Sequence, residues 1–217
     1  MKPISRMLLF IFCALAACAG HYRGKPFSEG RPQIIPGRIQ CEWYNLGGAG
    51  KAYHDADTVN NGSGRLNPPD GTFLHEFRMN EGVDISYTKS NGIDDNGFNF
   101  VKPEMNSLYV GWTEPGEWLN YTVAVEKDGI YQVGLMYTSN RGGQISFSVD
   151  GRGMTGPLNV QSTYVAVDTL SWRQWHHWNY ADSLATIALK KGIHVLTLHT
   201  LAEGNMNYDY LDFTFIR

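Results

Sequence analysis

Three tryptophans lie close together in the run S-W-R-Q-W-H-H-W, from Ser171 to Trp178. The flat face of an exposed indole can stack on the apolar C–H face of a sugar ring, while polar side chains beside it bind the hydroxyl groups. At this spacing the three rings cannot all share one face of a strand, so we expect at least one to be exposed. We expect Trp172, nearest the loop, to bind ligand, and Trp175 to pack in the core.

Residue patterns typical of catalysis are weak in this chain. The run His75–Met79 lacks the second histidine of a zinc helix, and the sequence contains no G-x-S-x-G motif. Glu114 and Glu117 could form the carboxylate pair of a glycosidase. The favoured interpretation is two solvated carboxylates that flank a turn. We therefore expect no enzymatic activity.

The residues between Tyr109 and Val125 predict two strands joined by a turn. Pro115 presets the φ angle of the second turn position and Gly116 accepts a positive φ at the third. In the second strand, apolar residues recur at every second position, as one buried face requires: Leu119, Tyr121, Val123 and Val125. This stretch predicts antiparallel β-structure at the centre of the chain.

Short segments with the same alternation follow and precede this stretch. They are Arg38–Glu42, Gly82–Tyr87, Gly129–Thr138, Gln144–Val149, Ser183–Leu189, Gly192–Leu201 and Tyr210–Ile216. Turn residues separate them, and no long segment has helical periodicity. The pattern predicts an all-β fold, an antiparallel β-sandwich.

The N-terminus predicts a lipoprotein signal peptide over residues 1–17. Lys2 and Arg6 precede an apolar run that is too short to cross a bilayer. The run ends in Leu-Ala-Ala-Cys, which is similar to a bacterial lipobox and implies a lipid on Cys18; the alternative is ordinary secretion. Residues 18–35 would be the lipidated cysteine and a polar tether, and residues 36–217 the domain. These features predict a lipid anchor in the bacterial cell envelope, with the outer membrane expected.

The net charge and the number of cysteines limit the classes of function that we expect for this chain. Removing residues 1–17 takes away Lys2 and Arg6, so the net charge moves from −3 to −5. This balance offers no basic footprint for nucleic acid. Of the three cysteines, only Cys41 would remain free in the domain, and we expect it to be a small buried apolar residue.

Several ordered motifs resemble the family 6 carbohydrate-binding modules. They are I-Q-C-E-W-Y, A-Y-H-D-A-D, E-G-V-D-I, V-G-W-T-E-P-G-E-W-L-N-Y-T-V, W-R-Q-W, G-I-H-V-L-T-L and M-N-Y-D-Y-L-D-F. The resemblance implies a jelly-roll sandwich of the galactose-binding-domain-like type, with sugar held between two aromatic rings and an asparagine. The matching positions are Trp172, Phe77 (where the family usually has tyrosine) and Asn207. Some members bind sugar on the concave face of a sheet.

A calcium site is also expected. Gln40 and Glu42 would share the outward face of the first strand, and Asp212 would point outward from the last. Oxygen ligands from neighbouring strands suit calcium, and the resemblance implies a structural calcium there. The alternative is three solvated residues at a sheet edge. Asp209 is expected to be structural.

Together these features predict a lipid-anchored module that binds polysaccharide or oligosaccharide without cleaving it. Its partners would be the glycan, the membrane through Cys18, and possibly glycan-degrading enzymes on other chains. Two alternatives stay open. One is a glycoside hydrolase or lyase on the same scaffold, and the other is a structural lipoprotein that docks a protein partner.

Overall fold

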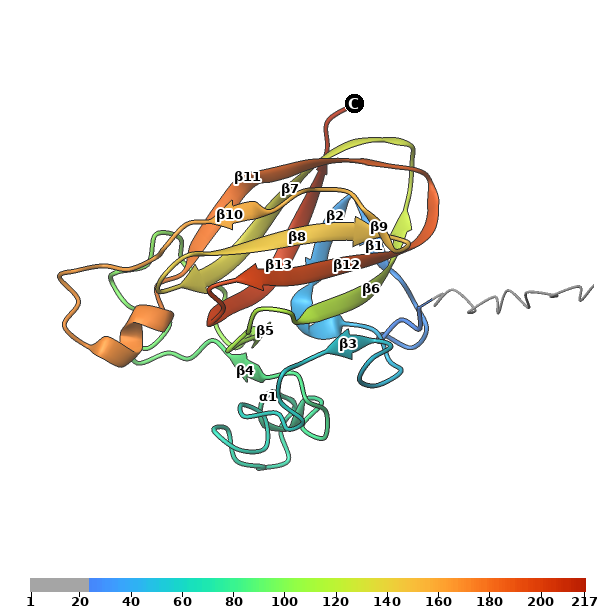
Figure 1. The fold of residues 1–217 in the computed structure, drawn as a ribbon. Helices are drawn as coiled ribbons and strands as arrows, with labels where there is room; N and C mark the ends of the chain where they lie inside the picture. The colour runs from blue at the N-terminus through green and yellow to red at the C-terminus, as the bar shows by residue number, and fades with distance from the viewer. Residues whose placement is uncertain (1–23) are drawn as a thin grey trace, which may run out of the picture.

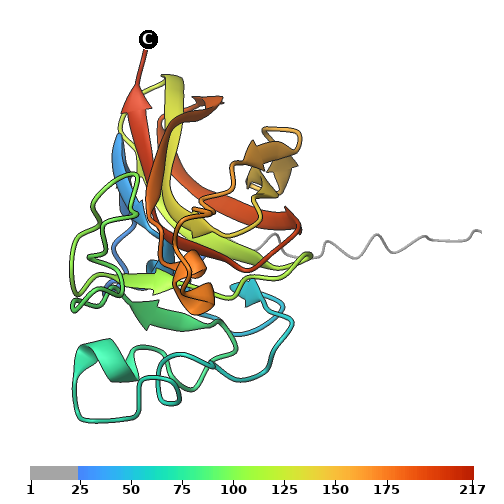
Figure 2. The same cartoon turned by 90° about the vertical axis from the view of Figure 1, so that its left-hand side faces the viewer.

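Two β-sheets form the two layers of the molecule, as Figures 1 and 2 show. The computed structural model describes residues 24–217. The first sheet contains β1 (Gln33–Ile35), β3 (Tyr53–His54), β6 (Trp118–Val125), β8 (Gly143–Val149), β9 (Arg152–Gly153), β10 (Leu158–Val160) and β12 (Gly192–Ala202). The second contains β2 (Gly37–Gln40), β4 (Ile85–Tyr87), β5 (Leu108–Val110), β7 (Gly129–Ser139), β11 (Asn179–Leu189) and β13 (Met206–Phe215).

The first sheet has the order β1-β6-β12-β8-β10 and the second β11-β7-β13-β5-β4. The pairing of β1 with β6 is parallel, and the other pairings of the described strands are antiparallel. The predicted all-β sandwich is therefore confirmed.

The core lies between the sheets and follows the alternation of the sequence. On β7 the inward residues Tyr131, Val133, Leu135 and Tyr137 are buried, and on β8 so are Ile145, Phe147 and Val149. Burying one large apolar side chain stabilises a fold by roughly 1.5–3 kcal/mol. Cys41 is free and buried, as predicted.

Helical structure within residues 24–217 is limited to three short segments. They are α1 (Phe73–Glu76) and the two 3₁₀ helices η1 (Cys41–Trp43) and η2 (Ser171–Trp175). Figures 1 and 2 show η2 at the same end of the sandwich as β4 and β5. None of these described helices is long and apolar enough to cross a membrane.

Two predicted boundaries near the N-terminus need correction. Residues Gln33–Ile35 form β1 and pair with Val123–Val125 of β6, so the end of the predicted tether belongs to the sandwich. The strand predicted over residues 38–42 ends at Gln40, where the chain turns into η1. The signal peptide and Cys18 lie outside the described residues.

Candidate functional site

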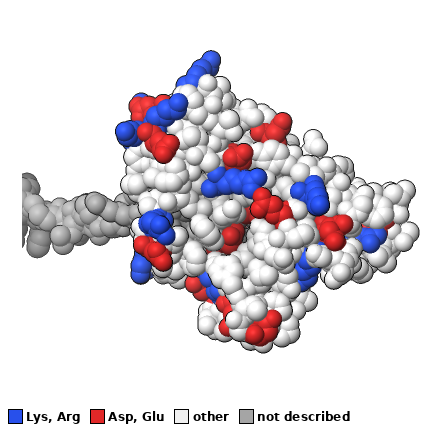
Figure 3. All heavy atoms as spheres, turned by 180° about the vertical axis from the view of Figure 1, so that it is seen from behind, with Lys and Arg blue, Asp and Glu red and all other residues white. Residues whose placement is uncertain are grey.

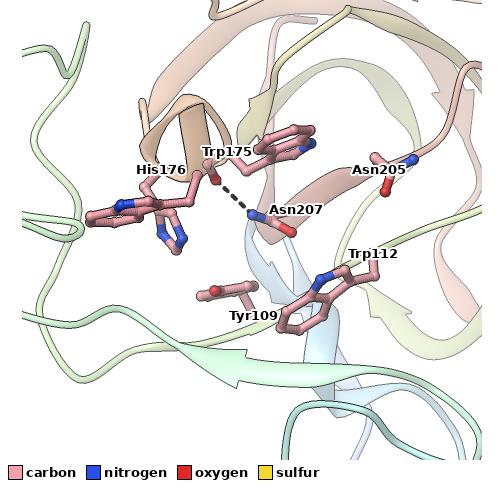
Figure 4. A pocket seen from close by; sticks show the side chains of 7 residues that line it. Tyr109, Trp112, Trp175, His176, Asn205 and Asn207 are labelled. Atoms are coloured by element: carbon pink, nitrogen blue, oxygen red, sulfur yellow. Dashed lines mark hydrogen bonds between the residues drawn. The ribbon is translucent and has the colours of Figure 1, made fainter. Parts of the chain in front are cut away.

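A pocket of about 340 Å³ opens at the end of the sandwich that carries η2. Its lining comes from β5, η2, β13 and the residues beside them, and is shown in Figure 4: Tyr109, Trp112, Trp172, Trp175, His176, Asn205 and Asn207. None of these residues is acidic, lysine or arginine. Protein pockets that bind small molecules have volumes of roughly 300–1,000 Å³ and mix apolar walls with a few polar groups.

The segment around η2 holds the Trp172 ring in the open. This ring is 49% exposed, although hydrogen bonds hold its neighbours Arg173 and Gln174 in place. Arg173 donates to Asp168 through Nε at 2.7 Å and Nη2 at 2.8 Å. The Gln174 amide donates to the carbonyl groups of Val165 and Asp168. Because these bonds order the loop before ligand arrives, Trp172 forms a preformed platform.

Asn207 lies at the floor of the pocket, on β13. Its amide nitrogen donates to Thr138 Oγ1 and to the carbonyl of Trp175, both at 2.9 Å. Both amide hydrogens are then used within the protein, and only Oδ1 remains to meet a ligand. This oxygen lies beside Gly111, where a Cβ atom would come within 2.9 Å of it. Asn207 therefore offers the pocket a hydrogen-bond acceptor.

Trp112 supplies an aromatic ring on the other side of Asn207 from Trp175 (Figure 4). It is 38% exposed, and its backbone has a φ of 50°, a region that bulky residues rarely adopt. The backbone after Trp112 is fixed by Thr113. The Thr113 hydroxyl donates to the Met206 carbonyl and accepts the Met206 N–H, both at 3.1 Å. Strained backbone of this kind often marks a functional residue.

His176 and Tyr109 complete the wall near Trp172. The His176 Nδ1 atom lies 2.8 Å from Oδ1 of Asp94, a fully buried carboxylate. Asp94 also accepts the indole N–H of Trp178 at 2.7 Å. The Trp178 ring is buried and packs edge-on against Tyr109, with the ring centroids 5.3 Å apart.

The structure brings together two of the three predicted sugar-binding residues, Trp172 and Asn207. Trp175, expected to pack in the core, is half-buried and lines the same pocket. The expectation for Phe77 is corrected: it is 5% exposed, packs edge-on against Phe27 and Phe73, and does not line this pocket.

The predicted calcium ligands are only partly together. Gln40 Oε1 and Glu42 Oε2 are buried and have no hydrogen-bond partner among residues 24–217. Burial raises the pKa of Glu42 well above its usual value, and the nearby Asp209 adds to this rise. Asp212, predicted as the third ligand, instead accepts a hydrogen bond from the Tyr180 hydroxyl at 3.1 Å.

The carboxyl group that lies near Glu42 on β13 belongs to Asp209. It is buried on β13, and burial raises the pKa of its carboxyl group to about 7. Among the described residues, no group of three or more His, Cys, Asp or Glu could hold a metal. The set of Gln40, Glu42 and Asp209 has only two carboxylates, but together with an amide oxygen these are ligands that calcium prefers.

Glu117 is not the solvated carboxylate that the turn predicted. It accepts the backbone N–H groups of Ala56 at 3.1 Å and Glu114 at 2.8 Å. Burial raises the pKa of Glu117 and that of Asp55 to about 7. These two carboxyl groups line a void of about 10 Å³, which has room for about one water molecule. This void is too small to hold a sugar ring.

A second, shallower depression of about 430 Å³ lies over β6, β8 and β12. Its lining includes Trp118, Asn120, Ser148 and His199. Some members of the family that the sequence resembles bind sugar on the concave face of a sheet. On the opposite face of the molecule, shown in Figure 3, charged side chains of both signs are mingled, and there is no patch of one sign.

Comparison with known proteins identifies one matching protein family and several solved structures with a similar fold. The model of the family "Carbohydrate binding module (family 6)" matches residues 84–217, more than half of the chain. This range contains Trp112, Trp172 and Asn207 and excludes Phe77. No curated protein matches the chain.

Two solved structures illustrate the similarity in fold. The module CsCBM6-3 from Clostridium stercorarium, solved with cellobiose, is 13% identical, with a TM-score of 0.53 over 86% of this chain and 99% of that one. A glycoside hydrolase family 43 arabinoxylan arabinofuranohydrolase from Bacillus subtilis, solved with cellotetraose, is 17% identical, with a TM-score of 0.50. That match covers 86% of this chain but 28% of the hydrolase.

Proposed function

Because the chain belongs to the family 6 carbohydrate-binding modules, we propose that its aromatic pocket binds a sugar ring of a polysaccharide or oligosaccharide. The observation that carries this proposal is the exposed Trp172 ring beside the free side-chain oxygen of Asn207. The indole would stack on the C–H face of the sugar, and the oxygen would accept a hydrogen bond from a hydroxyl group. Trp112 would provide the second aromatic contact in place of Phe77.

A glycan array, followed by calorimetry on the best ligand, tests this proposal. Trp172→Ala should weaken binding at least about tenfold, because stacking and apolar burial are lost together. Tyr164→Ala is the matched control: Tyr164 is exposed on the same loop but does not line the pocket. Equal binding by wild type and the Trp172 variant, with both folded, would remove this pocket from the function.

We infer that binding takes place without cleavage. The two carboxyl groups with raised pKa values, Asp55 and Glu117, face a void that is too small for a sugar ring. Incubation with polysaccharides should therefore release no reducing ends. Their release by purified protein, and its loss in Glu117→Gln, would support the hydrolase alternative.

We propose a structural calcium ion held by Gln40, Glu42 and Asp209. The two orphaned buried oxygens of Gln40 and Glu42 support this site. A divalent cation would neutralise the carboxylates of Glu42 and Asp209, which otherwise repel each other in a buried position. It would tie η1 to β13 and so stabilise the fold without touching the pocket.

We also propose that the module is anchored in the bacterial cell envelope by a lipid on Cys18. The Leu-Ala-Ala-Cys sequence after an apolar run supports this anchor. It would hold bound glycan near degrading enzymes on other chains. In cells, the wild-type protein should fractionate with membranes and carry an acyl mass on its N-terminal peptide, whereas Cys18→Ser should lose both.

A further inference from the structure

We propose that His176 is a ligand-binding residue whose Nε2 atom accepts a hydrogen bond from a sugar hydroxyl group. Asp94 is the positioning residue that fixes the imidazole tautomer required for this. The inference rests on the proposed function of the pocket and deepens it, because it says which ligand groups the pocket selects.

The surroundings of Asp94 fix where the His176 proton lies. The Asp94 carboxylate is buried, and it accepts the Trp178 indole N–H at 2.7 Å and the Lys89 backbone N–H at 2.7 Å. An ionised carboxylate can only accept hydrogen bonds. The His176 Nδ1 atom, 2.8 Å from Asp94 Oδ1, must therefore carry a hydrogen. In a neutral imidazole, Nε2 then has a free lone pair.

That lone pair is available to a ligand. Within the described part of the chain, His176 Nε2 has no hydrogen-bond partner, and the ring lines the pocket. The carbonyl of His176 accepts a hydrogen bond from Asn96 at 2.9 Å, and the imidazole packs edge-on against Trp172, with ring centroids 5.9 Å apart. The Asn96 bond fixes the His176 backbone, while Asp94 and Trp172 hold the ring itself, and its acceptor atom stays unused.

His176 and Asn207 give the pocket two hydrogen-bond acceptors of the same character. Both Asn207 amide hydrogens are already bound to Thr138 and Trp175. A sugar that presents free hydroxyl groups can donate to both acceptors. A ligand with methyl ether, acetyl or sulfate groups at those positions cannot, and no lysine or arginine lines the pocket to bind a sulfate. The ligand class is therefore a neutral glycan with unsubstituted hydroxyls at the two positions.

The tautomer can be measured without ligand. Long-range ¹H–¹⁵N correlation spectra of the full chain at pH 7.5 report which ring nitrogen of His176 is protonated. We expect Nδ1–H, and Asp94→Asn should perturb this signal because the acceptor-only carboxylate is replaced by an amide. A predominant Nε2–H form in the wild-type protein would overturn the proposal.

Matched substitutions separate the ligand contact from support of the loop. In His176→Asn the amide nitrogen can replace Nδ1 as the donor to Asp94, but nothing replaces Nε2. In His176→Gln the amide oxygen can occupy the place of Nε2. Affinity for the best ligand among cello-, xylo- and laminari-oligosaccharides should fall about tenfold in His176→Asn, the loss expected for one hydrogen bond, and less in His176→Gln.

Singly O-methylated versions of that best ligand, measured with wild type and with His176→Asn, form a double-mutant cycle between the ligand hydroxyl and His176. One methylation should weaken wild-type binding about tenfold and leave His176→Asn almost unaffected, because the bond is already absent there. If the wild type binds and His176→Asn binds equally well, this inference alone fails. If the wild type binds none of the oligosaccharides, the proposed function fails, and the inference that rests on it fails with it.

Discussion

The side-chain oxygen of Asn207 lies directly against the backbone of Gly111, with no space for a side chain between them. A Cβ atom at Gly111 would stand 2.9 Å from Asn207 Oδ1 and 3.2 Å from the ring of Tyr109. Both of these residues line the pocket. The absence of a side chain at position 111 therefore sets where the acceptor of Asn207 can lie.

Gly111→Ala should weaken glycan binding by about tenfold, because Asn207 must move or lose a hydrogen bond. The fold should persist, since the backbone N–H of Gly111 can still donate to the Asp84 carbonyl. Gly156→Ala is the control, because a Cβ there meets no atom within 4 Å. Calorimetric titration checks the effect, and equal affinities of the two variants would contradict it.

Asp168→Asn should loosen the loop that carries Trp172. The Arg173 guanidinium holds the pKa of Asp168 well below its usual range, and His177 contacts the same carboxylate at 2.8 Å. A group with a lowered folded-state pKa contributes stability above its unfolded value of about 4, and this stability is lost on acidification. We expect a lower melting temperature at pH 7 and weaker glycan binding.

Asp128→Asn provides the comparison for that effect. Asp128 pairs with Lys190 at 2.9 Å, but both side chains are exposed, so the pair contributes little. Calorimetric melting of both variants at pH 7 and pH 4 tests the difference. A drop at Asp128 as large as that at Asp168 would contradict our view of the loop.

Asp55→Asn should raise the melting temperature, and more at pH 8 than at pH 5. Burial and the nearby Glu117 raise the pKa of Asp55 to about 7, so the folded protein binds this proton more tightly than the unfolded chain. Stability therefore falls as pH rises from about 4 to about 7. The amide removes this pH-dependent loss. Melting curves in chelator at both pH values check it, and a uniform shift would contradict the assignment.

Calcium should raise the melting temperature of the wild-type protein by about 5–10 °C at a hundredfold excess over its dissociation constant. Glu42→Gln and Asp209→Asn should lose most of this response. Asp212→Asn should keep it, because Asp212 contacts Tyr180 and not the two orphaned oxygens. If the calcium response were lost in Asp212→Asn and kept in Asp209→Asn, the ligands would be Gln40, Glu42 and Asp212, as expected from the sequence.

The sandwich could be predicted from sequence because its signal is local: apolar alternation sets each buried strand face. The expectation for Trp172 comes from an aromatic-rich loop that is visible in the residues themselves, whereas Asn207 is implied only by the resemblance to the family. Glu42 does not lie on the outward face of a strand, as the alternation predicts. The chain turns into a 3₁₀ helix after Gln40, and this ends the period-two pattern. Asp209, expected to be structural, takes the place of Asp212 in the calcium site that we propose.

The aromatic partners of Trp172 could not be predicted in the same way. The sequence predicts a strand that contains Trp112, but the residue has a positive φ and its ring lines the pocket. Phe77 follows a long irregular segment, and its contacts with Phe27 and Phe73 bury it away from solvent. These placements depend on contacts between distant segments, which no short sequence pattern contains.

The six tryptophans allow one direct test of the binding site. Indole ¹H–¹⁵N signals of labelled protein, titrated with the best neutral oligosaccharide, report contact at each ring. We predict shifts for Trp112, Trp172 and Trp175, which line the pocket, while Trp118 on the sheet face stays unchanged. Saturable shifts confined to Trp118, with the three pocket rings unaffected, would contradict the account.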